Sequence, residues 1–373
     1  MNYLRRYSYI GPEISGSLGD LGVFLPYVIG AITIGGMDAS GVFMAFGIAY
    51  LFTAWFYRLP VPVQPMKIMG ASIIIAQITA GEAAAAGILL AVTLIFLALT
   101  GLIDKCAQFI PHSIISGIQT ALGISLGLLS IRYINNELWL GVVVAVLMLF
   151  LLRNRFVPVA LLGLGAGTLL FFLVHPGQTW PQLVPGFYLP HLIWPSWVDF
   201  QRGFTLAYLP QLPLTLTNAV LVTTALAAEL YPQSAARVTE RNLCLTMGLG
   251  NMALIPLGGL AFCHGAGGLA AHYSFGGRTA LTPLIIGSIL ILLGIFIGPQ
   301  SVDLLRLIPQ PVIGCLLLFS SLELISNARI PTQRTDMFCF ALVVVVSVAV
   351  NAGVAVAAGL ILAYLFHKQW VSI

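Results

Sequence analysis

Apolar residues occur along this chain in long runs, and polar residues are mostly confined to the short stretches between the runs. A helix that crosses a membrane needs roughly 20 mainly apolar residues. The pattern therefore predicts fourteen helical segments, several of them short or interrupted by Gly and Pro. Seven are expected in the first half, over 12–34, 41–57, 62–80, 83–101, 110–131, 137–152 and 156–174. Seven more are expected over 210–232, 239–255, 260–275, 280–298, 308–328, 335–350 and 353–367.

The composition excludes a soluble protein. Of the 373 residues 59% are hydrophobic and 8% are charged, and the mean hydropathy is +1.00. Soluble domains carry about 25% charged residues, because their surface must face water. The five cysteines have no Cys-x-x-Cys spacing, which argues against a disulfide framework or a zinc site. The net charge of +4 says little in such a chain, and nucleic acid is not an expected partner.

The two halves of the chain have matching segments. Moving the first half by 198 positions places each of its segments on a segment of the second half, and places Glu13 on Gln211 and Asp20 on Asn218. Because each half holds an odd number of spans, such a repeat is inverted. We therefore expect a first repeat over 1–174, an extracytoplasmic connection over 175–207 and a second repeat over 208–373. Chance agreement of segment lengths is the competing explanation.

The charged loops predict which side of the membrane each loop faces. Lys and Arg in short loops favour the cytoplasm, and the chain shows no cleavage site of a signal peptide near its N-terminus. With a cytoplasmic N-terminus, three cations fall outside, at Arg132, Arg202 and Arg306. Twelve fall inside, at Arg5, Arg6, Arg58, Lys105, Arg153, Arg155, Arg237, Arg241, Arg278, Arg329, Arg334 and Lys368. We expect both termini in the cytoplasm and the protein in the inner membrane of a prokaryote.

Three prolines prevent the third segment from being one complete helix. Pro60, Pro62 and Pro65 each lack an amide hydrogen and clash with a preceding helical turn. We expect the chain to begin this segment extended and to start a helix at Pro65 or Met66, where proline is tolerated. A helix that ends near Thr79 is roughly 20 Å long. It is too short to cross the membrane.

Glycines interrupt the corresponding tenth segment. Gly265, Gly267 and Gly268 favour a non-helical start followed by a short helix. Irregular backbone at membrane depth is tolerated only where protein or an aqueous cavity covers it, so both short helices should lie near the midplane, where secondary transporters bind substrates. Two helix N-termini that face one cavity form an anion site, and Lys67 adds a positive charge. The alternatives are that Lys67 extends to the cytoplasmic surface and that the glycines serve helix packing.

Four motifs occur in order along the chain: Gly16-Ser-Leu-Gly-Asp-Leu-Gly22, Pro62-Val-Gln-Pro-Met-Lys67, Pro210-Gln-Leu-Pro-Leu-Thr-Leu-Thr-Asn218, and Cys263-His-Gly-Ala-Gly-Gly-Leu-Ala270 with Phe275-Gly-Gly-Arg278. Together they resemble the molybdate transporter family within the sulfate permease superfamily. The resemblance implies seven plus seven inverted spans, a core and a gate domain, a site between the third and tenth segments, and molybdate or sulfate as substrate. Because the chain stops at Ile373, we expect no C-terminal regulatory STAS domain.

The expected substrate-binding residues are those at the two helix starts: Gln64, Pro65, Met66, Lys67, His264, Gly265, Ala266, Gly267 and Gly268. His264 could donate to an oxyanion, although a structural histidine is an equal alternative. Asp20, Gln211 and Asn218 are candidates for coupling or site support. An intramembrane carboxylate is costly, so Asp20 is expected to pair with Lys67, to cap a half-helix, or only to brace the backbone. Glu323 is expected to be solvated or paired with an arginine.

We expect an all-α polytopic membrane protein that imports a tetrahedral oxyanion by alternating access. Lipid surrounds it, protons are expected to be the coupling ion, and the resemblance raises a homodimer as a candidate assembly. No catalytic set, metal site or cofactor motif occurs in the sequence, so an enzyme is not expected. The alternatives are a nucleobase or other organic-anion carrier of the same architecture, and an anion channel.

Overall fold

The computed structural model describes residues 10–103, 111–151, 159–177 and 186–371. Within these ranges the protein is helical almost throughout, and its strands are one pair of two residues each. It is an all-α, multi-pass membrane protein. Several residues named above lie outside the described ranges, namely Arg5, Arg6, Lys105, Arg153 and Arg155.

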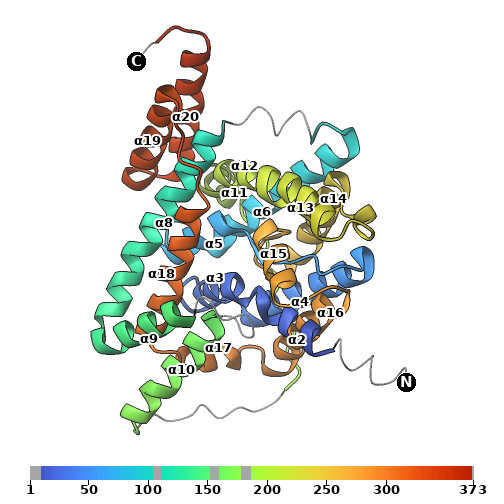
Figure 1. Cartoon of the computed structure of the whole chain (residues 1–373), viewed down its shortest axis with the longest axis vertical. Helices are drawn as coiled ribbons and strands as arrows, with labels where there is room; N and C mark the ends of the chain where they lie inside the picture. Colours follow the sequence, from blue (N-terminus) through green and yellow to red (C-terminus); the bar gives the residue numbers. More distant parts are fainter. Residues whose placement is uncertain (1–9, 104–110, 152–158, 178–185, 372–373) are drawn as a thin grey trace.

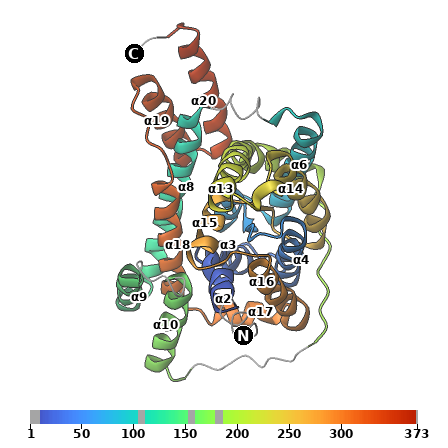
Figure 2. The ribbon, with the colours of Figure 1, turned by 45° about the vertical axis from the view of Figure 1, so that its right-hand side comes forward.

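The helices form two bundles that lie side by side, as two views of the molecule show (Figures 1 and 2). In the smaller bundle α8 packs along α18, and α9, α10, α19 and α20 extend from this pair. We call it the gate bundle. Its helices are α8 (His112–Asn135), α9 (Leu138–Leu151), α10 (Val159–Val174), α18 (Gln310–Ser326), α19 (Arg334–Ala349) and α20 (Ala352–His367).

The larger bundle, which we call the core bundle, contains the two strands and the remaining helices. Its first-half elements are α2 (Ile10–Gly19), α3 (Leu21–Thr33), α4 (Ala39–Tyr57), β1 (Gln64–Pro65), α5 (Lys67–Ile74) and α6 (Ala80–Thr100). Its second-half elements are α11 (Trp197–Gly203), η1 (Phe204–Tyr208), α12 (Leu209–Leu214), η2 (Thr215–Val222), α13 (Thr223–Leu230), α14 (Glu240–Leu254), β2 (Phe262–Cys263), α15 (Ala266–Ser274), α16 (Leu281–Leu292), η5 (Leu293–Ile297) and α17 (Gln300–Arg306).

Each of the fourteen predicted segments contains a helix. Four continuous helices in the described residues are long and apolar enough to cross a membrane alone, and two bent pairs also pass as single spans. The first bent pair is α2 with α3, which meet at 46° where Asp20 separates them. Strands β1 and β2 differ by the predicted offset of 198 positions, and α5 and α15 follow them directly.

The eighth helical segment begins earlier than the predicted 210–232, because helix begins at Trp197 and continues to Leu230. Ser196 is the N-cap of this helix. Its hydroxyl accepts a hydrogen bond from the Asp199 N–H, and the Asp199 carboxylate accepts one from the Ser196 N–H. Pro210 lies inside the helix. The wider turns of η1 directly precede Pro210, and such turns absorb the irregularity that a proline causes.

Helix α5 is shorter than predicted. It begins at Lys67 rather than at Pro65 or Met66, and ends at Ile74 rather than near Thr79. Ala76 has a positive φ of 58°, which interrupts the helical path. Thr79 instead caps the next helix, α6, where it accepts from the Glu82 N–H and Glu82 accepts from the Thr79 N–H. The half-helix is therefore eight residues long.

Candidate functional site

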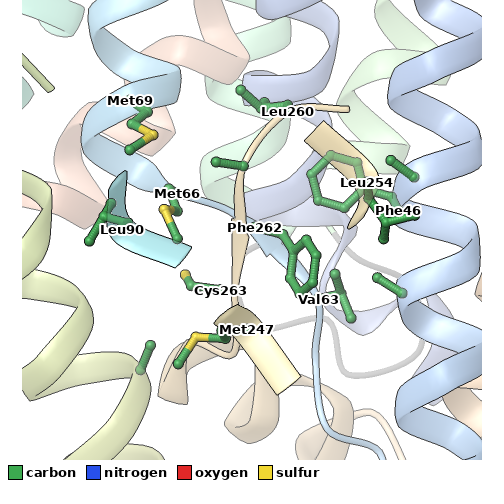
Figure 3. Packing of buried hydrophobic residues seen from close by; sticks show 14 of the residues in the cluster. Phe46, Val63, Met66, Met69, Leu90, Met247, Leu254, Leu260, Phe262 and Cys263 are labelled. Atoms are coloured by element: carbon green, nitrogen blue, oxygen red, sulfur yellow. The ribbon is translucent and has the colours of Figure 1, made fainter. Parts of the chain in front are cut away.

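The two half-helices are joined where their extended starts cross. Strands β1 and β2 pair antiparallel, with Gln64 opposite Cys263 and Pro65 opposite Phe262. The Asn251 side chain in α14 holds β2 from behind, since it accepts from the Phe262 N–H at 2.9 Å and donates to the Phe262 carbonyl at 2.8 Å. Figure 3 shows the apolar side chains around this crossing. They come from α4, α6 and α14, from the residues that flank β1, and from β2: Phe46, Leu90, Met247, Leu254, Val63, Met66, Phe262 and Cys263. The crossing is therefore fixed inside the core bundle.

Gln211 caps the first half-helix. Its Oε1 accepts from the N–H groups of Ile68 at 3.0 Å and Met69 at 3.4 Å, and its Nε2 donates to the Thr215 hydroxyl at 3.0 Å. The first amides of a helix have no partner within the helix, and here a neutral side chain from α12 supplies one. Gln211 thus supports the site from behind and touches the backbone of α5.

The second half-helix has an open first turn. Gly265 is the N-cap of α15, and its carbonyl accepts from the N–H groups of Gly268 and Leu269. A Cβ atom added to Gly267 would meet no atom within 4 Å, whereas one added to Gly268 would lie 2.7 Å from Pro62 Cβ and 2.9 Å from Asp20 Oδ2. Gly268 therefore allows close packing, and Gly267 faces open space.

That open space is a cavity of about 410 Å³ between the two bundles. The core bundle contributes residues from both half-helix starts and from η2, and the gate bundle contributes polar residues of α8 and of the end of α18. The lining residues are Lys67, His112, Ile115, Ser116, Gln119, Leu214, Thr217, Asn218, Val222, Gly267, Leu324, Ser326, Asn327 and Arg329. Three of these side chains are basic, and none is an Asp or Glu. The cavity thus combines positive charge with neutral hydrogen-bonding groups.

Few of the predicted binding residues line this cavity. Lys67 and Gly267 do, together with the predicted support residue Asn218. The other predicted residues lie buried behind it. These are Gln64, Pro65, Met66, His264, Gly265, Ala266 and Gly268. The gate-bundle side chains of the lining could not be predicted from the sequence, because Ser116 and Gln119 stand in an ordinary apolar helix that no motif distinguishes.

Lys67 pairs with Glu323 rather than with Asp20. The Nζ atom lies 2.8 Å from Glu323 Oε1, and the Lys67 side chain is 9% exposed while that of Glu323 is 34% exposed. The predicted Lys67–Asp20 pair is therefore wrong in this conformation, and so is the expectation of a solvated or arginine-paired Glu323. The pair joins residues that are 256 positions apart, a proximity that the sequence does not encode locally.

Asp20 is a buried carboxylate at the bend between α2 and α3. It stands at the N-cap position of α3 without a side-chain capping bond, so the predicted cap is not formed there. It accepts a hydrogen bond from Gln64 Nε2 and a longer one, 3.4 Å, from the Tyr50 hydroxyl. Among the described residues no cation pairs with it. Asp20 therefore connects the bend of the first span to the start of the first half-helix.

His264 is a structural residue in this arrangement. It is completely buried, its Nδ1 lies 2.7 Å from the Pro62 carbonyl, and its Nε2 lies 2.9 Å from the Thr246 hydroxyl. Thr246 in turn lies 2.7 Å from the Tyr57 hydroxyl. Both ring nitrogens are therefore occupied by protein groups. The expected donation to an oxyanion is not available to His264 here, and the alternative of a satisfied structural histidine holds.

The fold is that of known membrane anion transporters. The chain is similar to the transmembrane domain of a cyanobacterial bicarbonate transporter, BicA, with a TM-score of 0.71 and 19% identity over 93% of this chain and 97% of that one. It is also similar to murine Solute Carrier 26 family member A9 in its inward-facing state, with a TM-score of 0.68 and 13% identity over 98% of this chain and 69% of the other. These similarities establish the architecture.

Sequence comparison identifies the family. Residues 12–126 and 203–324 match the family described as "Molybdate transporter of MFS superfamily". The chain is 30% identical to Molybdate transporter 1 of Arabidopsis thaliana over 93% of its own length and 86% of that protein. It is 28% identical to Molybdate transporter 1 of Chlamydomonas reinhardtii over 94% and 90% of the two lengths. The chain belongs to this molybdate transporter family, whose members are transporters and not enzymes.

Proposed function

We propose that the protein is a secondary active transporter that imports molybdate, with sulfate as a second candidate, by alternating access. The observation that carries the proposal is the cavity between the bundles, which is lined both by Lys67 at the start of α5 and by Gly267 at the start of α15. Each helix N-terminus carries roughly half a positive charge. A small anion in the cavity would meet two such termini and a lysine.

The chemistry of the cavity favours an oxyanion. Asn218, Ser116 and Gln119 can donate hydrogen bonds to oxygen atoms without adding charge. The positive charge of Lys67 complements a dianion. Sulfate remains a candidate because both ions are tetrahedral dianions, and the preference for molybdate is based on the names of the relatives.

The position of the cavity supports an inward-open state. His112 at the start of α8 and Arg329 just after α18 both line it, at the helix ends that the charge pattern assigns to the cytoplasm. We propose that both termini are cytoplasmic, that the halves 1–174 and 208–373 are inverted repeats, and that the two bundles act as the core and gate domains. For a negative cell interior, a proton taken up with the anion would offset its charge, and Asp20 is the proposed carrier of that proton.

Equilibrium binding to the purified full chain tests the proposal. Molybdate, tungstate, sulfate and uracil are titrated into the wild-type protein and into Lys67→Ala, with Lys368→Ala as a control at an exposed position. We expect binding of the oxyanions, no binding of uracil, and a loss of affinity of at least about tenfold in Lys67→Ala. Unchanged oxyanion binding in Lys67→Ala would overturn the site assignment.

A further inference from the structure

The Lys67–Glu323 ion pair joins the two bundles. Lys67 begins α5, which the strand crossing fixes inside the core bundle, and Glu323 lies in the last turns of α18 in the gate bundle. The other ion pairs among the described residues each stay within one bundle: His175–Glu137, His191–Asp38, Arg202–Glu82 and Arg306–Asp303. A movement of one bundle against the other therefore has to stretch or break the Lys67–Glu323 pair.

Lys67 and Glu323 differ in how well water can solvate them once the ion pair breaks. A buried ammonium without a counter-ion is costly, and the Lys67 side chain is 9% exposed. Glu323 is 34% exposed, so water can solvate its carboxylate once the lysine is withdrawn. Lys67 therefore needs an anion at all times, whereas Glu323 does not need a cation.

The cavity provides a place from which another anion can reach Lys67. Lys67 lines it together with Gly267 and Asn218, and the gate-bundle residues Leu324 and Ser326, close to Glu323 in sequence, line it as well. An oxyanion bound there approaches the same ammonium that the Glu323 carboxylate now holds. The two anions compete for Lys67, because Lys67 is buried, whereas the other basic residues of the described lining, His112 and Arg329, are exposed to solvent.

We infer that Glu323 is an internal competitor of the substrate. In the substrate-free protein its carboxylate occupies Lys67 and holds the gate bundle against the core bundle in the present arrangement. The bound oxyanion displaces the carboxylate into water and removes this restraint, so that substrate occupancy and bundle movement become coupled. The inference rests on the proposed oxyanion site and assigns to it a residue outside the two half-helices that lowers its affinity for substrate.

Removal of the competitor is expected to tighten binding. The test measures the dissociation constant of inorganic molybdate for the purified full chain carrying Glu323→Gln, which keeps the side-chain shape and removes the charge. We expect binding to become tighter by about fivefold, which corresponds to about 1 kcal/mol. Glu323→Asp retains the charge on a shorter side chain, so its affinity for molybdate should lie between those of the wild type and Glu323→Gln. Glu229→Gln removes an exposed carboxylate of α13 and should change nothing. A gain in affinity is a result that mere structural damage does not produce.

A transport assay supplies the second measurement. In proteoliposomes, the wild-type protein should exchange labelled molybdate for internal molybdate faster than it performs net uptake, because the ion pair restrains the empty carrier. The ratio of exchange to net uptake should fall in Glu323→Gln and in Glu323→Asp.

The outcomes separate this inference from the proposed function. If Lys67→Ala weakens molybdate binding while both Glu323 variants bind like the wild type and keep its exchange ratio, the competition is refuted and the site stands. If Lys67→Ala binds molybdate like the wild type, the site itself is refuted. Should Glu323→Gln fail to fold, Glu323→Asp decides the question by the same two measurements.

Discussion

The side-chain oxygen of Gln211 in α12 accepts a hydrogen bond from the N–H of Ile68 in α5 at 3.0 Å. The cap of the first half-helix thus comes from the second half of the chain. Because the capping atom is neutral, the positive end of α5 is satisfied in hydrogen bonding without being neutralised in charge. The anion proposed to bind beside Lys67 would therefore meet a helix start whose dipole is not cancelled.

Gln211 variants separate these two contributions. We expect Gln211→Leu to lower the free energy of unfolding by about 1–2 kcal/mol, since two buried amides lose their acceptor. Gln211→Glu should retain the cap yet weaken molybdate binding by about tenfold, because a fixed negative charge then lies at the anion site. Thermal unfolding and equilibrium titration measure the two effects. Tight molybdate binding by a folded Gln211→Glu protein would show that the α5 terminus does not face the anion.

Gly267 and Gly268 should respond differently to the same added methyl group. Gly267→Ala meets open space, so the protein should fold normally while molybdate binding weakens by about tenfold as the methyl group enters the cavity. Gly268→Ala meets Pro62 and the Asp20 carboxylate within 3 Å and should lower stability by about 1–3 kcal/mol. Gly165→Ala in α10, which also meets no atom within 4 Å, is the control for binding. If Gly267→Ala and Gly165→Ala bind molybdate with equal affinity, the anion does not bind beside Gly267.

His264→Ala tests the structural role of this histidine. The substitution removes two buried hydrogen bonds, to Pro62 and to Thr246, and leaves a space, so we expect a loss of about 2–5 kcal/mol in stability. The affinity of the folded fraction for molybdate should change by less than about threefold. His191→Ala, at an exposed position, serves as the reference for unfolding temperature. A large loss of affinity for molybdate at unchanged stability would instead show that His264 takes part in binding the anion.

Asp20→Asn tests the coupling role. Its amide oxygen can still accept from Gln64 Nε2, so the protein should fold and should still exchange molybdate across the membrane. Uptake driven by an imposed proton gradient should be lost, because the amide cannot take up a proton at this position. The comparison uses proteoliposomes with and without a pH gradient, and Asp303→Asn at an exposed site is the control. Wild-type dependence on pH in Asp20→Asn would remove the proposed proton role.

The two broken segments could be predicted from the sequence because backbone chemistry determines them locally. Pro62 and Pro65 exclude helix, and Gly265 and Gly267 favour a non-helical start, whatever the rest of the chain does. The run of apolar segments likewise predicted a helix in every span. These features depend on residue type and on spacing within one segment.

Contacts between segments could not be predicted in the same way. The contact of Lys67 with Glu323 depends on how the gate bundle lies against the core bundle, and these residues are far apart in the sequence. The helix begins at Trp197, earlier than the predicted 210–232, because widened turns allow helix on both sides of Pro210. His264 was placed in the site from its position in a motif, although its side chain turns toward Pro62 and Thr246.

The pairing of Gln64–Pro65 with Phe262–Cys263 has a mechanical consequence. One half-helix cannot be displaced without its counterpart unless this short ladder and the Asn251 clamp on it are broken. The two parts of the cavity wall that the core bundle contributes are therefore tied into a single stiff body. If the cavity opens to each side of the membrane in turn, as proposed, the movement has to occur at the contact with α8 and α18, and the core-bundle wall keeps its shape.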